Sequence, residues 1–156
     1  MKHLKYFEDI NNFGHNIDVI RENYFEAALW TDDYYEELED KTIFDFSHKA
    51  KEQTNTEIMW FINTAGDILD DISDADIGHD LWLTRNGHGS GFSDRGYDDD
   101  IDDALSELSK QLGPVHLEVN DEKIDVINDS NEFLNFDIEK YKEELKFNRT
   151  VKKYNL

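Results

Sequence analysis

The chain of 156 residues contains no cysteine, a single proline and no long apolar run. Without cysteine, neither a disulfide framework nor a zinc site with cysteine ligands can form. None of the apolar stretches approaches the roughly 20 residues of a membrane-spanning helix. A signal peptide needs a continuous apolar region, whereas here Glu8 and Asp9 interrupt the first apolar residues. These absences predict a soluble cytoplasmic protein that makes no contact with a membrane.

Basic residues are also scarce, with 16 Lys and Arg against 37 Asp and Glu and a net charge of −21. A phosphate backbone attracts Lys and Arg, so direct binding to nucleic acid is not expected. Self-repulsion on this scale costs stability in a compact protein, which favours a role for the charge in binding. The simpler alternative is that the acidic surface only keeps the protein soluble.

The acidic residues are concentrated in four runs, which contain only two basic residues, Arg95 and Lys123. The runs cover residues 31–40, 67–80, 94–107 and 118–139. Residues 140–156 reverse the sign, with a charge of +4 beside −25 for the first 139 residues. An apolar stripe within 137–147 predicts a helix in this basic C-terminal segment, 137–156, that docks on the acidic body.

Apolar residues at helical spacing predict helices over about 16–36, 46–72 and 98–112, with Gly66 as a weak point in the second. Aromatic residues provide 13% of the chain, enough to favour a folded core over disorder. Trp30 and Trp60 are expected in that core, whereas Tyr34 and Tyr35 stand inside an acidic run and are candidates for an interface.

Two segments have the character of strands. Residues 80–84 (DLWLT) alternate, are rich in strand-forming residues and lead into the turn signal Asn86-Gly87. Residues 115–126 predict a hairpin with a turn at Asn120-Asp121. The predicted fold class is therefore α+β, with several amphipathic helices packed on a small antiparallel sheet. With neither a linker nor an internal repeat, 1–156 is expected to be a single compact domain.

The segment 78–96 (GHDLWLTRNGHGSGFSDRG) places many polar groups among closely spaced glycines, an order that no regular element requires. The polar groups are His79, Asp80, Arg85, Asn86, His88, Asp94 and Arg95. One interpretation is a metal or acid–base site built on the histidines and aspartates, in a small phage enzyme or metal-dependent factor. The favoured interpretation is a structured turn, in which Arg85 and Arg95 pair with Asp80 and Asp94 and His88 bonds to the backbone. Neither a metal nor a cofactor is then expected.

The same segment resembles a family of small acidic proteins from tailed phages and mobile elements. The family's pattern runs approximately G-H-D-F-W-L-T-R-N-G-H-G-A-G-F-W-D-R-G. Residues 25–31 (FEAALWT) resemble a second recurrent segment of that family, and the similarity covers about 24–126. Leu81 and Ser93 depart from the pattern, at positions where the family usually has Phe and Trp. The resemblance implies a phage origin and carries no known activity.

A calcium loop over Asp98, Asp100 and Asp102 is not expected, because position six is Asp103 instead of Gly and position twelve is Ser109 instead of Glu. The leading hypothesis is instead a phage-encoded acidic inhibitor, a DNA mimic that occupies the basic cleft of a host DNA- or RNA-binding protein. Defence nucleases and repair or replication factors are candidate targets, and a homodimer is left open. Asp67, Asp70, Asp71 and Asp74 are expected to form a line on one helix face. The full predicted surface is Asp32, Asp33, Glu36, Glu37, Asp67, Asp70, Asp71, Asp74, Asp98, Asp99, Asp100, Asp102 and Asp103.

Overall fold

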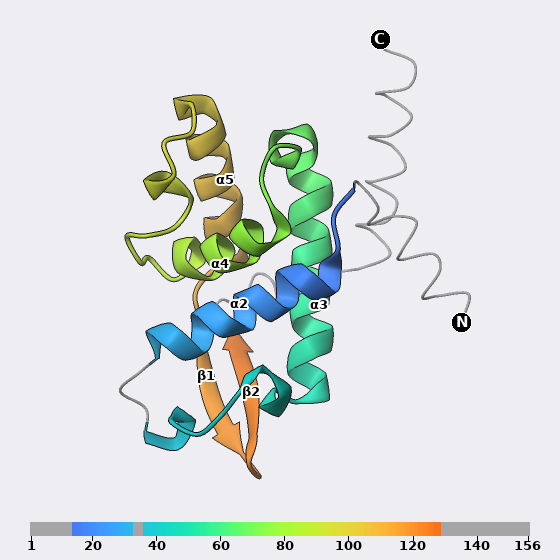
Figure 1. The fold of residues 1–156 in the computed structure, drawn as a ribbon, viewed down its shortest axis with the longest axis vertical. Coiled ribbons are helices and arrows are strands. Elements are labelled where there is room, and N and C mark those ends of the chain that lie inside the picture. The colour runs from blue at the N-terminus through green and yellow to red at the C-terminus, as the bar shows by residue number, and fades with distance from the viewer. Residues whose placement is uncertain (1–13, 33–35, 129–156) are drawn as a thin grey trace, which may run out of the picture.

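The computed structural model describes residues 14–32 and 36–128 as four α-helices, several short 3₁₀ helices and one two-stranded sheet (Figure 1). The elements are α2 (Ile17–Thr31), α3 (His48–Ala65), α4 (Asp74–Arg85), α5 (Asp99–Leu112), β1 (Val115–Asn120) and β2 (Lys123–Asn128). This arrangement confirms the predicted α+β class. The helix expected over 137–147 and the aromatic pair Tyr34 and Tyr35 lie outside the described residues.

Side-chain caps explain where three of the helices begin. Asn16, Ser47 and Ser73 precede α2, α3 and α4, and each side chain accepts a hydrogen bond from a backbone N–H in the first turn. Such caps satisfy donors that the helix itself leaves unpaired. The fourth helix, α5, begins instead with Asp99, Asp100 and Asp102 in its first turn, where the helix dipole favours negative charge.

The two long predicted helices are shorter in the structure. The first, α2, ends at Thr31 instead of residue 36, where the Thr31 hydroxyl turns back to bond the carbonyl of Ala27. The second is α3, which ends at Ala65 because Gly66 adopts a φ of 60°. A separate 3₁₀ helix, Gly66–Leu69, then follows. The weak point that the sequence indicated at Gly66 is therefore the actual end of the helix.

The predicted strand 80–84 is wrong, because these residues belong to α4. Ser73 caps this helix, and nearly every face of it is covered: Ile77, Asp80, Leu81 and Trp82 are all buried. A helix buried on all sides loses the apolar periodicity of 3.6 residues that identifies a surface helix. The alternation of apolar and polar residues that remains over 80–84 is typical of a strand, which explains the wrong prediction.

The hairpin is confirmed, and it extends to residue 128. Its strands pair antiparallel from Val115↔Asn128 to Asn120↔Lys123. The turn is Asp121-Glu122, both with positive φ, instead of the predicted Asn120-Asp121, because Asn120 is the last residue of β1. Phe46 adds a single parallel bridge to Ile124, and its ring stacks on Phe25 of α2 at a centroid distance of 3.7 Å. The hairpin therefore lies beneath α2, on the opposite side from α5 (Figure 1).

The close crossing of α2 and α4 depends on Gly78. A Cβ atom at this position would lie 2.1 Å from the carbonyl oxygen of Ile20 and 2.9 Å from the backbone nitrogen of Tyr24. Only a residue without a side chain allows the two backbones to approach so closely.

No helix in the described residues is long and apolar enough to cross a membrane.

We expect Gly78→Ala to destabilise the protein. Alanine would gain about 1 kcal/mol in helix propensity, but overpacking a close contact costs about 1–3 kcal/mol or more. Because the clash is with backbone that no rotamer change can relieve, we expect a net loss of about 2 kcal/mol in a denaturant melt. Gly89→Ala is the matched control, since its Cβ would meet no atom within 4 Å. Equal stability of the two variants would contradict the close crossing.

Candidate functional site

Arg85 lies at the centre of the motif segment 78–96 and contacts all four α-helices of the described chain. Its Nε donates to the carbonyl of Gly113 at 2.7 Å, and Nη2 donates to the carbonyl of Leu112 at 2.9 Å. Nη1 donates to the hydroxyl of Tyr24 on α2 at 3.0 Å, and Nη2 lies 2.9 Å from Oε2 of Glu57 on α3. Both side chains of this ion pair are almost fully buried. Arg85 therefore neutralises a buried carboxylate and caps the C-terminal carbonyls of α5.

The electrostatics of this cluster keep Arg85 charged. Burial alone would lower the pKa of the Arg85 guanidinium, but Tyr24 and Glu57 together raise it above its ordinary value. Burial likewise raises the pKa of the Tyr24 hydroxyl far above its usual range. Tyr24 therefore stays neutral and accepts the hydrogen bond from Arg85. The expected pairing of Arg85 with Asp80 or Asp94 is wrong, because its acidic partner is Glu57.

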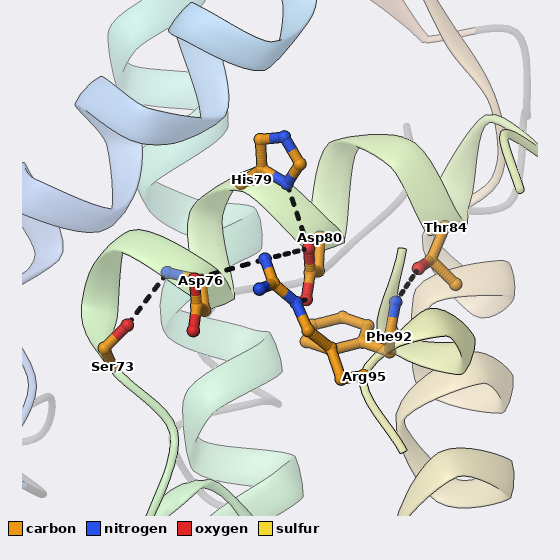
Figure 2. Close-up of polar contacts among 7 residues, drawn as sticks. All are labelled: Ser73, Asp76, His79, Asp80, Thr84, Phe92 and Arg95. Carbon is orange, nitrogen blue, oxygen red and sulfur yellow. Dashed lines mark hydrogen bonds and ion pairs between the residues drawn. The ribbon is translucent and has the colours of Figure 1, made fainter. Parts of the chain in front are cut away.

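The second ion pair of the motif joins Asp80 to Arg95, which is the part of the expected pairing that the structure contains (Figure 2). Nε and Nη2 of Arg95 donate to the two carboxylate oxygens of Asp80 at 2.9 and 3.0 Å, a bidentate arrangement. Arg95 also lies 3.1 Å from Asp76, and His79 Nδ1 lies 3.0 Å from Asp80. The hydrogen bonds that Arg95 donates to Asp80 raise the pKa of the Arg95 guanidinium. Asp80 is fully buried, so Arg95 supplies the charge that its burial requires.

The remaining motif residues hold the loop after α4 against the body. The hydroxyl of Thr84 accepts from the backbone N–H of Phe92 (Figure 2). The ring of Phe92 is buried and stacks on that of Phe61. A Cβ at Gly91 would lie 2.1 Å from that hydroxyl, so the contact requires glycine. Asn86 donates to the carbonyl of Trp82 and accepts from the N–H of Val115, which fixes the start of β1.

Residues 25–31 on α2 and the first part of the motif segment on α4 lie side by side. Trp82 Nε1 donates to the hydroxyl of Thr31 at 2.8 Å across this contact. Within the motif segment, Leu81 is fully buried. Ser93 is exposed, and its hydroxyl bonds to Asp102 at the start of α5.

The motif does not gather its histidines and aspartates into one site. His88 is exposed, and its backbone N–H donates to the carbonyl of Leu83 at 2.8 Å, as expected for a structured turn. Asp94 is exposed on the 3₁₀ helix Phe92–Asp94. Across the described ranges, no three His, Asp or Glu side chains form a group that could hold a metal ion. Both oxygens of Asp80 are bound by Arg95, which is the geometry of a structural carboxylate.

The expected line of carboxylates over 67–74 is not formed on one helix. Asp67 belongs to the 3₁₀ helix Gly66–Leu69, whereas Asp74 begins α4. Asp70 and Asp71 are exposed in the turn between them. Asp74 is also occupied within the body, since it binds Nδ1 of His15 at 2.7 Å and the N–H of Asn16 at 2.9 Å. The sequence was misleading here because acids at i, i+3 and i+4 suggest a helix even where a turn interrupts it.

A continuous line of carboxylates lies instead on α5. Asp99, Asp103 and Glu107 follow one another at i, i+4 and i+8, and all three are exposed. The opposite face of the helix carries Leu105 and Leu112, which are fully buried. Successive side chains at this spacing lie about 5–6 Å apart. Glu107 was missing from the predicted surface, although the apolar spacing of α5 already assigned it to the solvent face.

The other predicted acids lie near the C-terminal end of α2. Asp32 follows this helix and is partly buried, and Glu36 and Glu37 are exposed on the short 3₁₀ helix Glu36–Leu38. Asp33 lies outside the described residues. Trp30, expected in the core, is 66% exposed, and its ring lies beside His79 at a centroid distance of 6.4 Å. Comparison of the chain with protein-family models, curated proteins and solved structures finds no match.

We expect Arg85→Lys to destabilise the fold despite keeping the charge. An ammonium group cannot reach the four acceptors that the planar guanidinium binds, and each buried acceptor left unpaired costs about 1–3 kcal/mol. The free energy of unfolding from urea melts should therefore fall by about 3 kcal/mol. Arg21→Lys is the control, because Arg21 binds the exposed Asp18 and the amide oxygen of Asn55 through a single nitrogen, Nη1. An ammonium group can replace one nitrogen, and the exposed pair is worth less than about 1 kcal/mol. A loss at Arg85 no larger than that at Arg21 would show that the cluster is not a structural centre.

Proposed function

We propose that the protein is a phage-encoded acidic inhibitor that acts in the host cytoplasm. In this proposal its exposed carboxylates occupy the basic cleft of a host DNA- or RNA-binding protein, such as a defence nuclease or a repair or replication factor. The carboxylates take the place of nucleic-acid phosphates. The line of Asp99, Asp103 and Glu107 on α5 is the observation that carries the proposal.

This line suits a phosphate mimic for two physical reasons. A helix anchored by a buried apolar face holds its charges at fixed spacing, so binding loses little conformational entropy. An extended negative potential also steers a basic surface toward it and raises the association rate. The three side chains fulfil both conditions, because they are exposed on a helix whose other face packs in the core.

The distribution of the arginines supports the same proposal. Arg85 and Arg95 neutralise Glu57 and Asp80, the two acidic residues that are buried in the described chain. Arg21, the other arginine of these ranges, pairs with Asp18 on its own helix. Arginine is therefore used where burial requires a counter-charge, and the face of α5 is left negative. A surface that served only solubility would not need an ordered line of this kind.

The test is capture of proteins from a bacterial lysate on the immobilised full-length chain, followed by elution with short duplex DNA. We expect nucleic-acid-binding proteins that DNA displaces. Binding should weaken steeply with salt, because the Debye length falls from about 10 Å at 0.1 M to about 3 Å at 1 M. Two exposed pairs are worth together about 0.4–2 kcal/mol. The variant Asp103→Asn/Glu107→Gln should therefore bind the captured protein about two- to thirtyfold more weakly.

The matched control is Asp121→Asn/Glu122→Asn, which removes the same charge at the exposed hairpin turn, far from α5 (Figure 1). Asparagine tolerates the positive φ of both positions. The control should bind nearly as well as the original chain. The melting temperatures of both variants should be equal to or higher than that of the original chain, because removing acidic charge reduces self-repulsion. Equal weakening in the two variants would favour a general effect of charge. Binding that neither DNA nor salt reduces would contradict the proposal.

A further inference from the structure

A cavity of about 340 Å³ lies between the C-terminal end of α2 and the segment that leads to α3. Trp30 and, one helical turn earlier, Glu26 line it from α2, while Leu38 and Glu39 line it from the following segment. Its volume is at the lower end of the roughly 300–1,000 Å³ range of ligand pockets. The cavity therefore has room for a single side chain or a small molecule.

The lining combines an exposed aromatic ring with an excess of negative charge. Trp30 is 66% exposed, although large aromatic side chains are usually covered in a folded monomer. Three carboxylates, those of Glu26, Asp32 and Glu39, line the same cavity against the single ammonium group of Lys41. An aromatic face beside carboxylates is the environment that binds organic cations, through cation–π attraction and ion pairing.

We propose that this cavity binds an arginine side chain of the protein that the acidic surface recognises. The inference rests on the proposed function for the existence of a basic partner. It adds a specific anchor to the carboxylate line of α5, which lies on a different part of the molecule. Exposed tryptophan and arginine are also the residues that most often dominate the energy of an interface.

Arginine fits the lining better than lysine does. A guanidinium group is planar, so it can stack on the indole of Trp30 and still present paired N–H groups to a carboxylate. An ammonium group is a strongly hydrated point charge, and Lys41 already supplies one at this cavity. Since Lys41 places a positive charge at the same cavity, its removal should strengthen the binding of an added guanidinium.

The Asp32 carboxyl at this cavity would gain from an additional cation. Burial raises the pKa of the Asp32 carboxyl above its ordinary value, and the nearby His116 and His88 only partly offset this effect. Desolvation disfavours the charged carboxylate, and a cation placed beside it would restore a favourable interaction. Phe44, which follows the lining residue Ile43, is 76% exposed and provides an aromatic control next to the cavity.

The test uses small probes and the full chain, with the indole N–H signal of Trp30 observed by NMR. The probes are N-acetyl-arginine amide, its lysine counterpart and the neutral isostere N-acetyl-citrulline amide. We expect arginine to shift the Trp30 signal saturably, lysine to bind more weakly and citrulline to have no effect. Shifts by citrulline equal to those of arginine, or no saturable shift by arginine, would overturn the proposal.

Variants then locate the binding. Trp30→Ala should weaken arginine binding, followed at backbone amides of the lining, by about three- to thirtyfold. Glu39→Gln should weaken it, Lys41→Gln should strengthen it, and Phe44→Ala should leave it unchanged. Loss of affinity in Phe44→Ala equal to that in Trp30→Ala would place the probe outside the cavity.

Lysate capture that depends on α5 but not on Trp30 would refute only the anchor. Arginine binding without any DNA-displaced capture would refute only the proposed partner.

Discussion

The buried contact between Arg85 and Glu57 is the interaction on which the described structure depends. One guanidinium joins α4 to Tyr24 on α2, to Glu57 on α3 and to the last carbonyls of α5. Two buried charges are costly unless both are paired and hydrogen-bonded. Any packing that separated these helices would leave a buried charge unpaired, which is costly. The cluster therefore favours one arrangement of the four α-helices. The motif segment is therefore a folding element, and the pair of Asp80 with Arg95, which joins its two ends, repeats the same principle.

Using arginine inside the body has a consequence for the surface. The chain carries 37 acidic and 16 basic residues, and a buried pair of one arginine and one carboxylate is neutral, so the whole excess of acidic residues is left to the exterior. On α5, exposed acids at i, i+4 and i+8 convert that excess into an ordered line. Near the end of α2, the exposed ring of Trp30 adds an aromatic surface beside three further carboxylates. The neutral ion pairs inside the protein and the negative charge on its surface therefore both follow from the same excess of acidic over basic residues.

Local patterns predicted α5 and the hairpin, because one face of each is buried and the turn residues are distinctive. The pairing of Asp80 with Arg95 was also predictable, since both belong to one short motif. By contrast, α4 was predicted as a strand because burial on every side removes its helical period. Glu57 lies 28 residues before Arg85 in the sequence, and nothing local marks it as the partner. The exposure of Trp30 was not predicted either, because an aromatic residue within a helix usually belongs to the core.

The most direct test of this account is hydrogen exchange at the Nε–H of Arg85, measured by NMR on the full-length protein. Its donor lies 2.7 Å from the carbonyl of Gly113, and its side chain is fully buried. If the cluster fixes the helices, this proton should exchange only on global unfolding, as slowly as the most protected backbone amides of α3. The Nε–H of the more exposed Arg95 should exchange much faster. Exchange at Arg85 as fast as at Arg95 would contradict the account, because the central contact would then open without unfolding the protein.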